Sequence, residues 1–159
     1  MTGFASDAEH ELPPRAPRSA RRRARELVLQ GLYQWRVGGA DAASIEAQAP
    51  EMEGFAKADG EFFTAALRGV IGQQEALTER IAAHIDRPFA ELSPIESCVL
   101  LLGCFEMLNH PETPYRVIIN EAIELTKTFG GTDGHKYVNG VLDKVAAVLR
   151  PDEVAARRK

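Results

Sequence analysis

Residues 93–105 of the chain read SPIESCVLLLGCF, and this stretch decides the class of fold. Ser93 and Glu96 have the spacing of a capping box, and Pro94 takes the first helical position, so the sequence predicts that a helix begins here. Residues 98–105 are all apolar or glycine, whereas a helix at a surface carries polar residues on one side. The sequence therefore predicts a central helix that other helices cover on most sides.

Apolar residues recur at helical spacing on both sides of this stretch, and capping or helix-ending residues mark the boundaries. Helices are expected near residues 19–37, 42–48, 59–85, 94–109, 113–129 and 133–149. Gly69 and Gly72 weaken the case for an unbroken helix over 59–85. The apolar faces of the last two helices include Phe129 and Val148, which we expect to be buried.

No stretch shows the sustained alternation of polar and apolar residues that marks a half-buried strand. The predicted fold is all-α, a compact bundle of six or seven helices built as two halves around residues 98–105. Residues 1–18 contain three prolines and few apolar groups, so we expect a disordered tail there. Residues 19–151 are expected to form one helical domain, followed by a charged tail over 152–159.

The composition is that of an ordinary globular protein, with 45% hydrophobic and 26% charged residues. No apolar run approaches the roughly 20 residues that span a bilayer, and no signal peptide is apparent. The expected location is the cytoplasm, without membrane contact. Cys98 and Cys104 have no cysteine or histidine cluster around them, so we expect buried thiols and neither a metal site nor a cofactor.

Positive charge is concentrated in one segment although the net charge of the chain is −4. Residues 15–25 contain six arginines and no acid, which indicates a bounded contact helped by a partner. On a helical wheel, Arg22, Arg25, Tyr33 and Arg36 fall within about 80° and away from the apolar face. Guanidinium groups beside an exposed ring can hold phosphates while the ring stacks on a base. The alternative is a solvated basic face without a ligand.

A second candidate site is the glycine-rich loop GGTDGHKY, residues 130–137. A phosphate-binding loop of the nucleotide hydrolases needs Gly-Lys followed by Ser or Thr after a strand, and here a helix is expected before the loop. Nucleotide hydrolysis is therefore not expected. A helix start with free N–H groups, together with Lys136 and Tyr137, can take one phosphate and one base. The alternative is a simple capping loop.

The sequence does not predict an enzyme. Glu121 and Glu124 are paired carboxylates of the kind used in acid–base catalysis, but no nucleophile or metal ligand accompanies them. The four histidines are scattered, and neither an H-E-x-x-H nor a G-x-S-x-G motif is present.

Four motifs, in order and at compatible spacing, resemble those of the NusB family. They are RRRARE at residues 21–26 with Leu32, Tyr33 and Trp35; SPIE at 93–96 before a helix ending in FEML at 105–108; PYRVIINEAIELTK at 114–127; and HKYVNGVLD at 135–143. The resemblance covers about residues 19–151, most of the chain. It implies a fold of two packed helical subdomains.

The resemblance also implies a function in transcription antitermination without catalytic activity. Family members bind the boxA element of nascent ribosomal-operon RNA together with NusE, a small-subunit ribosomal protein, and through that complex they meet other Nus factors and RNA polymerase. The residues implied for RNA are Arg21, Arg22, Arg23, Arg25, Gln30, Tyr33, Lys136 and Tyr137. Those implied for NusE are Glu91, Ile95 and Glu96, although capping of the central helix competes for Glu96.

The chain departs from the family pattern at three positions. Tyr137 replaces a more frequent Phe, and base stacking should survive. Gly134 replaces a more frequent Ser, so we expect Asp133 to cap the last helix. Leu101 stands where many members carry a basic residue, which puts a polar contact there in doubt.

Two other interpretations remain open. One is an RNA-binding module related to the amino-terminal domain of ribosomal RNA cytosine methyltransferases, but no glycine fingerprint after a strand is present. The other is a self-associating structural bundle whose basic segment only aids solubility. A steep salt dependence of RNA binding would distinguish the adaptor from that bundle.

Overall fold

All regular elements in the described part of the chain are helices. The structure is a computed structural model that describes residues 19–158, so the expected tail at 1–18 lies outside the described residues. Within that range there are eight α-helices, three short 3-10 segments and no strand. The α-helices are α2 (Ala20–Gly38), α3 (Ala42–Gln48), α4 (Gly60–Gly72), α5 (Gln74–Ala82), α6 (Pro94–Asn109), α7 (Tyr115–Phe129), α8 (Gly134–Leu149) and α9 (Pro151–Arg158).

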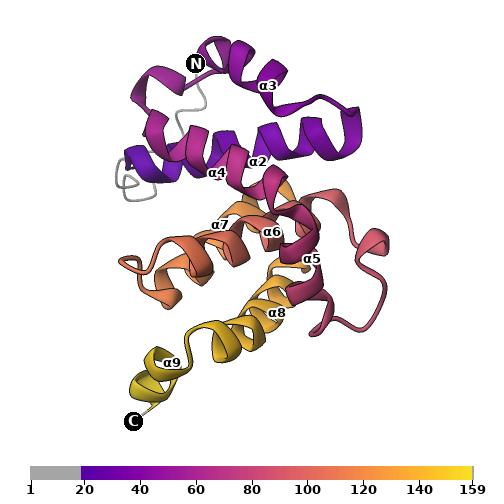
Figure 1. Ribbon diagram of the computed structural model, residues 1–159, viewed down its shortest axis with the longest axis vertical. Helices are drawn as coiled ribbons and strands as arrows, with labels where there is room; N and C mark the ends of the chain where they lie inside the picture. The colour runs from indigo at the N-terminus through magenta and orange to yellow at the C-terminus, as the bar shows by residue number, and fades with distance from the viewer. Residues whose placement is uncertain (1–18, 159) are drawn as a thin grey trace, which may run out of the picture.

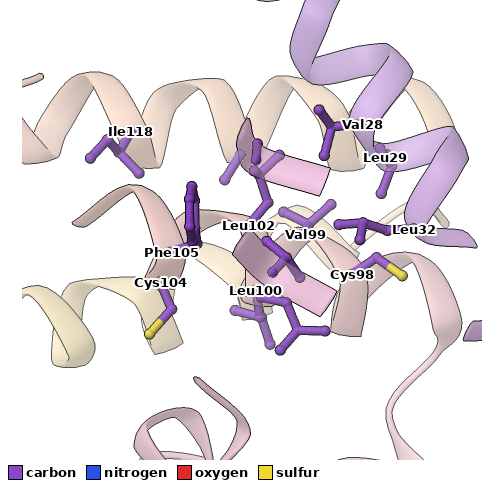
Figure 2. Close-up of a cluster of buried hydrophobic side chains, with 14 of the residues drawn as sticks. Val28, Leu29, Leu32, Cys98, Val99, Leu100, Leu102, Cys104, Phe105 and Ile118 are labelled. Carbon is purple, nitrogen blue, oxygen red and sulfur yellow. The ribbon is translucent and has the colours of Figure 1, made fainter. Parts of the chain in front are cut away.

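The central helix is α6, and it begins where the sequence predicts. The hydroxyl of Ser93 accepts a hydrogen bond from the backbone N–H of Glu96 at 3.2 Å, and Pro94 is the first helical residue. Residues 97–107 of α6 are all buried, and the helix contacts α2, α4, α5, α7 and α8. Figure 2 shows Val28 of α2 and Val99 of α6 within one buried apolar cluster.

Two groups of helices flank α6 (Figure 1). The indigo and magenta helices α2, α3 and α4 lie together on one side, where α2 packs against both α4 and α6. On the other side α7 and α8 pack against each other and against α6, and α9 follows α8 at the far end of the molecule. The predicted all-α bundle in two halves around α6 is therefore confirmed.

The helix expected over residues 59–85 is two helices. Gln73 ends α4 and starts α5, with φ −107° and ψ 16°, outside helical geometry. Its N–H still bonds to the carbonyl of Gly69 at 2.9 Å, so the break interrupts the helix for a single residue. Both helices pack on α6. The break at Gln73 allows α4 and α5 each to turn its own apolar face toward α6. The helical spacing of apolar residues alone does not predict such a break.

Most of the expected charged tail at 152–159 is helical, because residues 151–158 form α9. Pro151 starts this helix, where the lack of an N–H costs nothing. Val154 is buried, and the carboxylate of Glu153 accepts a 2.8 Å hydrogen bond from the N–H of Tyr115. Glu153 thus caps α7 from a distant part of the chain.

Two apolar residues expected in the core lie at the surface. Val148 is 60% exposed near the end of α8, and Phe129 is 36% exposed at the end of α7. Both lie in the last turn of a helix. There the apolar face of the helix extends past the neighbouring helices that cover the rest of it. Surface apolar residues that occur singly are common in soluble proteins.

Gly69 provides a test of the packing around α6. A Cβ at Gly69 would overlap the ring of Phe105, which is buried, whereas a Cβ at Gly72 would meet nothing within 4 Å. Gly69→Ala should therefore lower the free energy of unfolding by about 1–3 kcal/mol through overpacking. The matched change Gly72→Ala should leave it within about 1 kcal/mol or raise it. Urea unfolding of both variants gives the comparison, and equal effects would show that α4 can move away from Phe105.

Candidate nucleic-acid interface

The predicted RNA residues lie on two helices. Arg21, Arg22, Arg23, Arg25, Gln30 and Tyr33 are on α2, and Lys136 and Tyr137 are in the first turn of α8. Ser19 starts α2, since its hydroxyl accepts the N–H of Arg22 at 3.0 Å. Arg22 and Tyr33 are 11 residues apart, about 16 Å along the helix axis. The arginines and Tyr33 are therefore at separate points along α2.

Arg25 is not on an exposed surface, so the expected arc is wrong at this position. Its side chain is only 5% exposed, and its guanidinium donates hydrogen bonds of 2.9 and 2.8 Å to the carboxylate of Glu106, which is 2% exposed. Glu121 of α7 lies 3.6 Å from the same guanidinium. A buried arginine needs such a partner because desolvating an unpaired charge is costly. Arg25 is thus occupied within the protein.

Arg22 is paired in a similar way but nearer to solvent. It donates two hydrogen bonds to Glu121, at 2.9 and 2.6 Å, and these bonds raise the pKa of Arg22. Its side chain is still partly exposed, whereas Glu121 is mostly covered. Neither Glu121 nor Glu106 was predicted from the sequence to bind an arginine. The one available signal was Glu106 itself, a lone acid among apolar residues of a helix predicted to be central.

Arg21 and Arg23 lie beside this pair at the start of α2. Arg21 donates to Asp59 at 3.2 Å, and its guanidinium lies 4.5 Å from the ring centre of Phe62. The N–H of Phe62 also bonds to Asp59, and it is the main cause of the lowered pKa of that carboxylate. Arg23 has no ion pair among residues 19–158, and with Gln30 it borders an open cleft of about 610 Å³.

The start of α8 carries the second group of predicted residues. Lys136 is exposed and lies 3.3 Å from the carboxylate of Asp133. Asp133 makes no side-chain capping bond to α8, so the capping role expected for it is not found. Tyr137 is half-buried, and burial is the main cause of its raised pKa. Its hydroxyl lies 3.3 Å from Asp86.

The residues expected to bind NusE adjoin the start of α8. Glu91 is exposed at the end of the 3-10 segment Phe89–Glu91, and Ile95 and Glu96 are half-buried in the first turn of α6. A Cβ placed on Gly134 would lie 3.0 Å from a carboxylate oxygen of Glu96. The structure therefore brings the first turns of α6 and α8 together.

The chemistry available on these surfaces is binding by charge and by aromatic rings. No group of three potential metal ligands occurs within residues 19–158. Burial raises the pKa of both thiols, Cys98 and Cys104, to about 11, so both remain protonated near neutral pH. No helix in the described residues is long and apolar enough to cross a membrane.

Comparison with known proteins gives one consistent result. The sequence model of the NusB family matches residues 22–147. A protein of Dechloromonas aromatica named transcription antitermination protein NusB is 78% identical, over 100% of this chain and 98% of the relative. A protein of Paraburkholderia xenovorans with the same name is 58% identical, over 89% of this chain and 99% of the relative.

Solved structures have the same fold. The chain superposes on NusB of T. maritima with a TM-score of 0.70 and 28% identity, covering 84% of this chain and 92% of that one. A second neighbour is the crystal structure of the antitermination factors NusB and NusE in complex with double-stranded RNA, with a TM-score of 0.70. At 19% identity, with 81% of this chain and 97% of that chain covered, this second likeness concerns the fold alone.

The buried pair can be tested against an exposed pair of the same geometry. Arg68 donates bonds of 2.8 and 2.7 Å to Glu46, and Arg68 is exposed. Glu106→Gln leaves the buried Arg25 with Glu121, 3.6 Å away, as its remaining carboxylate, so it should lower the free energy of unfolding by about 3 kcal/mol, the lower end of the cost of breaking a buried pair. Glu46→Gln should cost no more than about 1 kcal/mol. Equal losses in chemical unfolding would show that burial does not strengthen the Arg25 pair.

Proposed function

The chain belongs to the NusB family, and we propose that it is a transcription antitermination and elongation adaptor that binds boxA-type RNA together with NusE. The observation that carries this proposal is the 78% identity, over the whole chain, to a relative named transcription antitermination protein NusB. That name denotes a regulatory protein rather than an enzyme, and the chain is not an enzyme. Through NusE and RNA the chain would join other Nus factors and RNA polymerase in the cytoplasm.

The proposed RNA face consists of Arg21, Arg22, Arg23, Gln30 and Tyr33 on α2 with Lys136 and Tyr137 on α8. Three features support it: Tyr33 is 41% exposed, Lys136 is exposed, and Arg23 has no ion pair among the described residues. Exposed rings can stack on unpaired bases while cations hold the phosphates. Arg25 is withdrawn from this face, because its guanidinium is buried against Glu106.

The proposed NusE surface consists of Glu91, Ile95 and Glu96. Its acidic groups suit a basic ribosomal protein, and its proximity to the start of α8 would let one RNA contact both proteins. Two linked binding faces on one RNA raise the affinity through effective concentration. The chain would therefore bind RNA modestly alone and more tightly with NusE.

The methyltransferase-related alternative has less support. The matches extend over 98% and 99% of the lengths of the two relatives described above, so those relatives are proteins of similar length. A self-associating bundle remains a competing function, and it differs in its response to salt. Association through neutral packing has no steep dependence on salt concentration, whereas phosphate contacts do.

Titration of a labelled boxA RNA tests the proposed function. Fluorescence anisotropy is measured with the chain alone and with NusE added, at several salt concentrations, for single-stranded RNA and for a duplex of the same sequence. We expect tighter binding in the presence of NusE and weaker binding as salt rises. Absence of binding with and without NusE would refute the proposed function. Equal affinity in both titrations would refute the cooperation.

Asp133 provides a second test, at the edge of the proposed face. Its carboxylate lies 3.3 Å from the ammonium group of Lys136 and makes no capping bond to α8. Asp133→Asn removes a negative charge that opposes phosphate and releases Lys136. We expect unchanged or slightly tighter RNA binding, with a melting temperature close to that of the wild type. A clear loss of affinity in a folded variant would show that Asp133 itself contacts the RNA.

A further inference from the structure

The arginines of this protein differ in how their charge is balanced. Arg22 and Arg25 each make two short hydrogen bonds to a carboxylate that is largely covered, and Arg21 bonds to Asp59. In such a pair the carboxylate already balances much of the positive charge of the arginine and accepts hydrogen bonds from some of its N–H groups. A phosphate must therefore compete with the carboxylate for it. Cations without such partners are better candidates for strong phosphate contacts.

Arg36 is one such cation, near the carboxyl end of α2. Its guanidinium lies 4.8 Å from the ring centre of Phe89, which is buried. It has no ion pair with any residue of the described part of the chain. A guanidinium that lies over the face of a ring is attracted to that position, and its N–H groups can still donate hydrogen bonds to a ligand.

Arg87, in the connection between α5 and α6, is held in the same manner against the first turn of α8. Its guanidinium lies 5.1 Å from the ring centre of Tyr137. Its only ion pair in residues 19–158 is with the preceding residue, Asp86, at 3.0 Å. The side chain of Asp86 is 70% exposed, so water and salt screen this pair and it contributes little. Arg87 can thus exchange Asp86 for a phosphate at low cost.

These two arginines belong to one surface. Arg87 and Phe89 are two residues apart, so their Cα atoms are at most about 7 Å apart. Both lie in the connection between α5 and α6, which runs along one edge of the molecule (Figure 1). Through the two ring contacts, this connection joins the end of α2 to the start of α8. Neither arginine is among the RNA contacts that the family resemblance implies.

We propose that Arg36 and Arg87 hold phosphate groups of the bound RNA, and that the rings of Phe89 and Tyr137 orient them for this contact. The inference rests on the proposed function and extends it to a surface along the connection between α5 and α6. An acidic protein segment is the other ligand that such cations can take. RNA is favoured because the guanidinium of Arg87 lies over the ring of Tyr137, and the preceding residue of α8, Lys136, is exposed, so the first turn of α8 brings an aromatic ring and cations to one end of the helix.

The test compares alanine and lysine variants of both arginines by RNA titration at several salt concentrations. Arg36→Ala and Arg87→Ala should each weaken binding and flatten the slope of log affinity against log salt by about 0.7, and the double variant by about 1.4. Arg36→Lys and Arg87→Lys keep the charge, so the slope should stay while affinity falls less. Arg68→Ala is the matched control, since Arg68 is exposed on α4 and paired with Glu46; it should change neither quantity.

The outcomes separate the inference from the function on which it rests. If the wild type binds no RNA with or without NusE, both are refuted. If the wild type binds RNA and the double alanine variant binds with the same affinity and slope, the inference alone is refuted. Loss of NusE binding with unchanged RNA binding would assign the two arginines to a protein partner and refute it as well. Melting temperatures of all variants establish that each is folded.

Discussion

The ion pair between Arg25 and Glu106 links the first half of the molecule, through α2, to the central helix α6. Arg25 comes from α2 and Glu106 from α6, and both side chains are almost fully buried. Breaking a buried pair leaves an uncompensated charge, so the two helices can pack only in an arrangement that keeps these groups together. Glu121 of α7 lies 3.6 Å from the same guanidinium and also binds Arg22. Three helices are thereby held in one relative position.

This network determines which cations remain available at the surface. At the start of α2, carboxylates of α6, α7 and the segment before α4 balance Arg25, Arg22 and Arg21. Near the end of the same helix, Arg36 has an aromatic neighbour instead. A chain with a net charge of −4 can therefore present a limited basic surface without being basic as a whole. Such a surface suits an adaptor that depends on a second protein for part of its affinity.

Features with a local cause could be predicted from the sequence. The capping signal at Ser93 and the uninterrupted apolar run after it predicted the start and the central position of α6. Gly39, with a left-handed φ of 76°, ends α2 close to the predicted point. Features that depend on distant residues could not be predicted. Glu153 caps α7 from α9, 38 residues away along the chain, and this contact turns an expected tail into a packed helix.

The candidate site was predictable only in part for the same reason. A helical wheel groups Arg25 with Tyr33 and Arg36, but it contains no information on Glu106, 81 residues further along the chain. Ring contacts such as Arg87 over Tyr137 also join segments that are remote in sequence.

Backbone amide chemical shifts, measured as boxA RNA is added to the labelled protein, test the location of the RNA most directly. We expect the largest changes at residues 21–23, 30–37, 86–91 and 133–137. Changes confined to α3, α4 or α9 would contradict this location.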